Sequence, residues 1–219
     1  MLGSINGVAI KTAEVTLPFR GVWTADVVTE GEIDADGPVT ITIADLTLVG
    51  TVDRMGDFLG SGNLRIVGGA GGWMKPVPAK YYQNSFGLKL SPIVSDAARE
   101  AGETVNVSSD AERTVGSFYM REQAPAARVL AQLTSLWWVD FAGVTQVAVT
   151  RKATPITATF DVLPKGTDLH LGRVALATDT PCAFVPGCTF SSQTLSKQTI
   201  STVVHRLGAN KLRTEVWTQ

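Results

Sequence analysis

The stretch that most constrains the fold is residues 113–151, because its pattern changes from strand to helix and back to strand. Val115–Tyr119 is rich in strand-forming residues, and Pro125 suits the first turn of a helix. Apolar residues then recur at helical spacing. They are Ala126, Val129, Leu130, Leu133, Leu136 and Trp137. We predict a strand, a helix over about 125–138, and a hairpin that turns at Ala142-Gly143.

A second helix is predicted over about 91–102. Ser91 can cap its first turn, Pro92 fits the first helical position, and Gly102 is a natural C-terminal stop. Residues 73–90 hold two prolines and several aromatic residues, and we interpret them as a packed connector. Residues 81–152 are therefore expected to form a small α/β module with two helices.

The flanking regions have the alternating pattern of antiparallel strands. Residues 1–80 contain six short alternating segments, among them Val39–Ile43 and Leu46–Val52, which favours a small barrel or sandwich. Residues 153–219 return to strands and end in a hairpin of Ile200–Leu207 and Lys211–Trp217, with its turn at 208–210. The expected fold class is α+β, mostly antiparallel β, with region boundaries near residues 80 and 152.

Composition excludes few classes of function. The chain has 219 residues and a net charge of −1, so no general attraction to nucleic acid or anionic membrane is expected. No run reaches the ~20 apolar residues of a membrane span, and Met1–Lys11 lacks the pattern of a secretion signal. Cys182 and Cys188 could pair or remain free, and they are too few for a structural zinc site.

No motif predicts a catalytic, cofactor or metal site. The run Gly68–Gly72 is not followed by a helix, so it does not match a phosphate-binding loop. Asp34 and Asp36 resemble the start of a calcium loop but lack the later glutamate ligand. His170 and His205 stand far apart in the sequence, and no G-x-S-x-G motif is present.

Two further clusters have a structural and a functional interpretation. Trp137-Trp138 could stack on a sugar, but burial is the more ordinary role of large aromatic residues. We therefore predict that Leu130, Leu133, Trp137 and Trp138 form the core of the α/β module. The basic residues Arg206, Lys211 and Arg213 either face a partner or a nucleic-acid channel or lie on a solvated sheet face.

The order of these elements resembles a known family. The residues that carry the resemblance are the helix 91–102, the segment Ser117–Gln123, the helix from Pro125, the hairpin residues Val139–Phe141 and Gln146–Val149, and the N-terminal pair Thr16–Pro18 and Trp23–Asp26. They resemble phage tail and baseplate hub proteins of the late control protein D family. The chain is also similar in plan to the base of type VI secretion spikes.

The resemblance implies tail-tube-like β-barrel domains with the α/β module inserted between them. It implies a homotrimeric ring that adapts a sixfold tail tube to a threefold tip and surrounds the DNA channel. The implied partners are other copies of the chain, a distal tail or tube protein, a tail-tip, fibre or spike protein, and the tape measure protein. DNA would only pass through, and no stable membrane insertion is expected. The implied location is the virion, after assembly in the host cytoplasm.

At 219 residues the chain is short for this family, so extra hub domains would be absent or belong to another chain. Two alternatives stay open. One is a module that binds host-envelope glycans through Trp137, Trp138 and Tyr81-Tyr82. The other is a hydrolase that uses Cys188 or Ser117 with His205.

Overall fold

The fold is dominated by antiparallel strands. The computed structural model describes residues 2–151, 154–192, 195–208 and 211–218. Strands account for 55% of the residues and helices for 12%, which confirms the expected mostly antiparallel β fold. The predicted boundary at 152–153 and the turn residues Ala209-Asn210 lie outside the described residues.

The N-terminal region forms a closed six-stranded β-barrel. Its strands are β1 (Gly3–Ile5), β2 (Val8–Pro18), β3 (Thr24–Thr29), β4 (Pro38–Ile43), β5 (Leu46–Phe58) and β6 (Ser61–Gly68). Pairing runs β1-β4-β5-β6-β3-β2 and returns from β2 to β1. Alternate residues point into the barrel: Val39, Ile41 and Ile43 of β4 are buried, as the alternating sequence requires.

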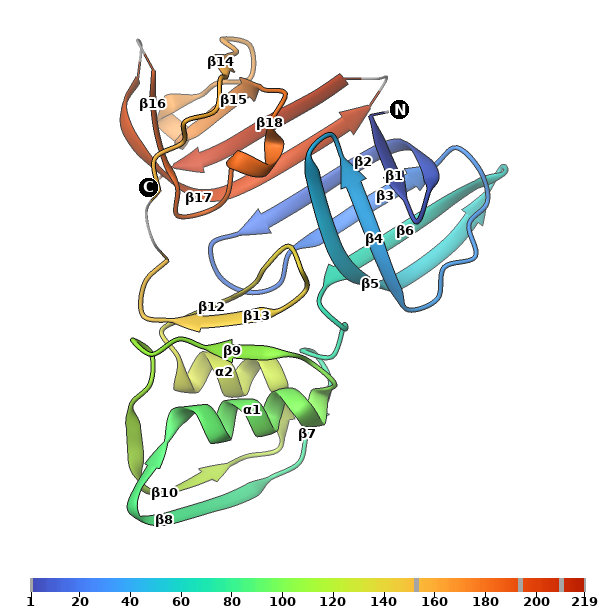
Figure 1. Cartoon of the computed structure of the whole chain (residues 1–219). Helices are drawn as coiled ribbons and strands as arrows, with labels where there is room; N and C mark the ends of the chain where they lie inside the picture. Colours follow the sequence, from blue (N-terminus) through green and yellow to red (C-terminus); the bar gives the residue numbers. More distant parts are fainter. Residues whose placement is uncertain (1, 152–153, 193–194, 209–210, 219) are drawn as a thin grey trace.

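A second set of strands extends the barrel at β2. Val8 and Ala9 pair with β1, whereas residues 12–18 pair with β17 (Leu195–Gly208). From there the sheet continues through β18 (Lys211–Thr218), β15 (Arg173–Ala177) and β14 (Asp161–Val162), and β16 (Thr189–Ser192) pairs with β17. Among the described residues, eleven strands thus belong to one continuous sheet that joins the two ends of the chain (Figure 1).

The middle of the chain forms the α/β module. Its elements are β7 (Pro76–Val77), β8 (Lys80–Lys89), α1 (Leu90–Ala101), β9 (Val105–Val107), β10 (Thr114–Arg121), β11 (Ala124–Pro125), α2 (Ala126–Leu133), β12 (Leu136–Val139) and β13 (Thr145–Ala148). The two helices lie between the β8–β10 pair and the sheet of β12, β13 and β9 (Figure 1). Their buried faces supply the module's core, with Ile93, Val94 and Leu130 fully buried.

The second helix is shorter than predicted. It ends at Leu133 rather than near 138, because Thr134 is extended and its hydroxyl donates to the Leu130 carbonyl at 2.7 Å. Leu136–Val139 then forms β12 and pairs with β13. The apolar spacing of Leu136 and Trp137 fits a helix, but a partner strand satisfies their backbone groups instead.

The first helix also begins differently. It starts at Leu90, and its N-terminal amides are satisfied from outside the helix: Leu90 and Ser91 donate to Glu112 Oε1 at 3.0 and 3.4 Å. Ser91 therefore lies within the first turn and is not the cap. The supposed connector 73–90 contains the ten-residue strand β8. No helix in the described part of the chain is long and apolar enough to cross a bilayer.

Candidate functional site

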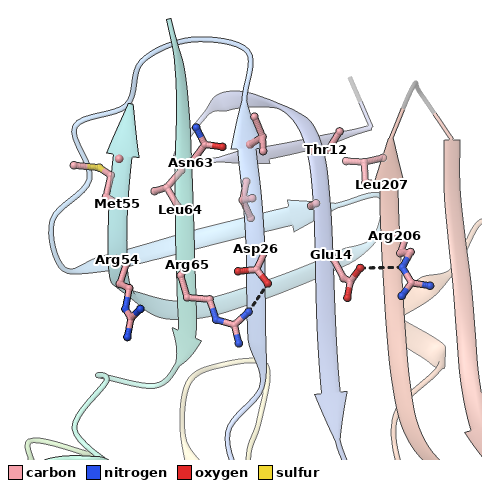
Figure 2. Close-up of a pocket in the computed structure, with 14 residues that line it drawn as sticks. Thr12, Glu14, Asp26, Arg54, Met55, Asn63, Leu64, Arg65, Arg206 and Leu207 are labelled. Atoms are coloured by element: carbon pink, nitrogen blue, oxygen red, sulfur yellow. Dashed lines mark hydrogen bonds and ion pairs between the residues drawn. The ribbon is translucent and has the colours of Figure 1, made fainter. Parts of the chain in front are cut away.

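A row of charged side chains crosses the outer face of the large sheet. Strand register places Arg54 beside Arg65, Arg65 beside Asp26, and so on across six strands. In order, the row is Arg54 (β5), Arg65 (β6), Asp26 (β3), Glu14 (β2), Arg206 (β17) and Arg213 (β18). We call this set the charged row. Figure 2 shows five of its members side by side.

Ion pairs join the inner members of the charged row. Arg65 pairs with Asp26, and Arg206 Nε donates to Glu14 Oε2 at 2.9 Å. Arg206 also contacts Glu215 at 2.6 Å, and hydrogen bonds to Glu14 and then Glu215 raise its pKa. At one end of the row, the Arg54 side chain is 87% exposed, and its one ion pair among the described residues is with the neighbouring Asp53, 3.6 Å away.

A broad groove of about 630 Å³ lies along the charged row, with Ala13, Val27, Met55 and Leu207 among its lining residues (Figure 2). From the sequence we had predicted only the basic end of the charged row. There Arg206 and Arg213 stand opposite each other in register, and Lys211 lies at the end of the hairpin. The other members were missed because register between strands cannot be read from single strands. Each is one charged residue in an alternating strand.

The residues predicted to form the module's core lie in two settings. Leu130, Leu133 and Trp137 are buried, and the Trp137 ring lies 5.5 Å from that of Trp73. Trp138 is half-buried beneath the guanidinium of Arg151, which lies 4.7 Å from the ring centroid.

Arg151 joins three parts of the molecule. Besides covering Trp138, it donates to the Pro18 and Phe19 carbonyls of the barrel at 3.2 and 3.0 Å. Its side chain also lines the space at Gly187, next to β16. Burial lowers the pKa of Arg151 to about 10, so it remains charged at neutral pH. The contacts fit a structural role at this junction.

The aromatic residues of the glycan alternative do not gather on one surface. β8, which carries Tyr81 and Tyr82, and β12, which carries the tryptophans, lie on opposite sides of the helices (Figure 1). Tyr81 is 54% exposed, whereas the Tyr82 hydroxyl contacts Asp96 Oδ2 at 2.6 Å. No platform of stacked rings results from these positions.

Tyr82 belongs to a buried polar cluster around Arg121, which is fully buried. Arg121 Nε and Nη2 donate to the Pro78 carbonyl at 3.1 and 2.9 Å, and Nη1 to the Tyr82 hydroxyl at 3.0 Å. Nη2 also pairs with Glu100.

The helix α1 completes this cluster with Asp96. Burial would raise the pKa of Asp96, but hydrogen bonds from Lys80, Tyr82 and Arg99 hold it well below its usual range. Burial and the bond to Asp96 raise the pKa of Tyr82. Arg121 therefore ties β10 to β8 and α1.

The glycine run 68–72 binds a carboxylate of the chain itself. Ala70 N donates to Glu103 Oε2 at 3.0 Å and Gly72 N to Oε1 at 2.5 Å. A Cβ at Gly72 would lie 2.0 Å from the Ala101 carbonyl oxygen, so this position requires glycine. Glu103 is buried, and its bonds to the loop fasten the barrel to the module.

Ser117 and His205 of the hydrolase alternative are not brought together. Ser117 is exposed in β10 at one end of the molecule, and His205 is buried in β17 at the other (Figure 1). His205 Nδ1 contacts Thr214 Oγ1 at 3.0 Å, and Nε2 has no hydrogen-bond partner among the described residues. Burial lowers the His205 pKa to about 4.

The two cysteines are both free. Cys188 is buried, while Cys182 is exposed with its Sγ 2.7 Å from Asp45 Oδ2. Partial desolvation of the thiol and then the bond to Asp45 raise the pKa of Cys182 to about 11. Within the described residues, no group of three or more His, Cys, Asp or Glu side chains is placed to hold a metal ion.

No family model matches the sequence, and no curated protein matches it. Solved structures do match, over 99% of the chain. They are an E. coli type VI secretion component (TM-score 0.69, 13% identity, 76% of that chain), a 43 kDa prophage MuSo2 tail protein from Shewanella oneidensis (0.70, 10%, 95%) and a tail protein from Neisseria meningitidis MC58 (0.69, 12%, 95%).

The chain has the fold of these tail proteins. This confirms the resemblance to tail proteins that was drawn from the sequence. Because the match covers almost the whole chain, the tail-protein fold includes both the barrel with its extended sheet and the α/β module.

Proposed function

We propose that this chain is a non-enzymatic structural subunit of a phage tail, placed in the hub of the tail tip or baseplate. Two of the similar structures are tail proteins. The third, the type VI secretion component, is described as similar to the T4 tail proteins gp27 and gp5. In our proposal three copies form a ring around the DNA channel, with the tail tube on one side and a threefold tip on the other.

The observation that carries the proposal is the continuous sheet that crosses from the barrel into the C-terminal strands. A sheet of this extent with open strand edges invites pairing with other chains, and proteins normally cover such edges. A closed ring of head-to-tail contacts covers them without leaving a free end. The charged row would then repeat around the ring, on a face that three copies share.

The proposed partners follow from this position. They are other copies of the chain, a distal tail or tube protein, a tail-tip, fibre or spike protein, and the tape measure protein, with DNA only in passage. The proposed location is the virion, after assembly in the host cytoplasm. The separation of Ser117 from His205 and the burial of Trp137 favour neither a hydrolase nor a glycan-binding module.

Native mass spectrometry of the purified protein and of the assembly extracted from virions tests the proposal. We expect a species of three times the 23.2 kDa subunit mass, and a threefold ring in averaged electron micrographs. A chain that remains monomeric even in the extracted tail would contradict it.

A further inference from the structure

We propose that the outer edge of β5 in one copy docks beside β14 of a second copy, with Arg54 of the first facing Asp161 of the second. The inference rests on the proposed ring and names the two surfaces that close it. It is carried by three observations: an open strand edge, an open groove, and opposite charges on the two open edges, Arg54 on β5 and Asp161 on β14.

The β5 edge is open over residues 53–57. β5 has 13 residues, but β4 pairs only with its first part, up to Thr51. Beyond that point β6 occupies one side of β5, and no described strand pairs with the other. All five residues are exposed, and Met55, at 43%, and Leu59 in the hairpin turn, at 88%, add apolar surface.

The β14 edge is open at the other end of the sheet. Asp161 and Val162 pair with Ala177 and Leu176 of β15 on one side, and no described strand lies on the other. A groove of about 540 Å³ runs beside them, lined by residues 158–162 and by Ser191 and Ser192 of β16. The Phe160 ring packs edge-on against two other rings, with its centroid 5.6 Å from that of Phe184 and 5.8 Å from that of Phe190, so the groove has an apolar base.

The charged row supplies the complementarity. At the β5 end it terminates in Arg54, whose one ion pair within the described part of the chain is with the neighbouring Asp53. At the other end, extending the β15–β18 register by one residue sets Ala177 opposite Arg213, and Asp161 pairs with Ala177. Extended through Ala177 to Asp161, the line of the charged row therefore starts with an exposed cation, Arg54, and ends with an exposed anion, Asp161. Continuing it from one copy to the next brings Arg54 to Asp161.

The occupant of the groove is a second copy because one chain cannot bring its own two edges together. The β5–β6 hairpin and β14 lie on opposite sides of the molecule (Figure 1). Contact between two different surfaces is heterologous, and repetition by a rotation that closes gives a ring. The charges also discourage a symmetric contact between two β5 edges, because it would place one Arg54 near another.

Charge reversal is the first test. Arg54→Glu or Asp161→Arg alone should raise the dissociation constant of the oligomer roughly tenfold or more, measured by analytical ultracentrifugation. The double variant Arg54→Glu with Asp161→Arg should restore assembly to near the wild-type value. Arg128→Glu on α2, exposed and outside both edges, is the matched control and should assemble normally. Singles without effect, or a double variant no better than the singles, would overturn the inference.

Cross-linking is the second test. One chain carries Arg54→Cys and another Asp161→Cys, both with Cys182→Ser and Cys188→Ala, and the two are mixed and oxidised. We expect a disulfide between residues 54 and 161 of different chains, identified by peptide mass spectrometry. A bond only between two copies of Arg54→Cys would overturn the inference in favour of a symmetric contact.

The tests separate this inference from the proposed ring. If the wild-type chain is trimeric but neither charge reversal nor cross-linking behaves as expected, the ring stands and the β5–β14 contact is wrong. If the chain is monomeric even in the extracted tail, the proposed function fails and this inference fails with it.

Discussion

The buried cluster around Arg121 and the exposed charged row use the same residue types in opposite settings. Arg121 is fully buried in the α/β module, whereas the side chains of Arg65, Arg206 and Arg54 are 41%, 43% and 87% exposed. Both regions pair arginine with carboxylates. The difference lies in access to solvent. Water can hydrogen-bond to the charged groups of the row, whereas only protein groups can hydrogen-bond to Arg121.

Burial therefore separates charges that hold the fold from charges that remain available to a partner. Removing one member of a buried pair leaves an uncompensated charge and is strongly destabilising, whereas an exposed pair contributes about 0–1 kcal/mol. The module is expected to depend on its polar cluster for stability. The sheet is expected to tolerate changes in the row as a monomer and to show them in assembly.

The largest effect is expected at Arg121. Arg121→Met should lower the free energy of unfolding by about 3–5 kcal/mol, because Asp96 and Glu100 lose a buried cation and the Pro78 carbonyl loses its donors. Urea denaturation followed by circular dichroism measures this. Arg99→Ala removes an exposed cation from the same Asp96 and should cost less than about 1 kcal/mol. Equal losses in the two variants would contradict the distinction.

The next effect is a pH dependence from His205. Its folded pKa of about 4 lies below the ordinary 6.5, so the unfolded chain binds the proton more readily. Stability should be full above about pH 6.5 and should fall by about 3 kcal/mol as the pH drops to about 4. The contribution of Asp96, whose pKa is lowered, is lost only below its own ordinary range, near pH 4.

Denaturation at a series of pH values separates these windows. His205→Gln should flatten the curve between pH 6.5 and 4, while His170→Gln, at an exposed position, should leave it unchanged. A wild-type curve that is already flat in this window would show that His205 is not held neutral by burial.

A smaller loss is expected where Glu103 binds the glycine run. Glu103→Gln keeps the shape but replaces one acceptor oxygen with a donor, which faces the amide of Ala70 or Gly72. The expected cost is about 1–3 kcal/mol, that of an unsatisfied buried group. Glu122→Gln, at an exposed position in the same module, serves as control and should be neutral in the same urea experiment.

Side-chain periodicity in the sequence was enough to predict the elements whose structure depends mainly on neighbouring residues in the chain. The barrel's alternating strands and the apolar face of α1 follow from side-chain periodicity, and both are present. The predicted end of α2 was wrong because Leu136 and Trp137 fit either a helix face or a strand, and pairing with β13 decides between the two. β8 was missed for a related reason, since its stability comes from pairing with the distant β10.

The charged row shows where sequence reasoning reaches its limit. Glu14 and Arg206 are 192 residues apart, and only the register of β2 with β17 brings them together. The Arg121 cluster likewise joins three elements of the module. The sequence shows the chemical type of each residue. It does not show which residues are neighbours in space, because pairing between segments distant in the chain decides this.

The smallest effect is expected within the charged row itself. A double-mutant cycle on Arg65→Ala and Asp26→Ala should give a coupling of about 0.2–1 kcal/mol in the monomer, falling as salt is added, because both side chains are half exposed. The same cycle on Arg121 and Glu100 should give a larger coupling that salt changes little. A row coupling as large and as salt-resistant as the buried one would mean that the row also holds the fold, and its charges would then no longer be free to serve a neighbouring copy.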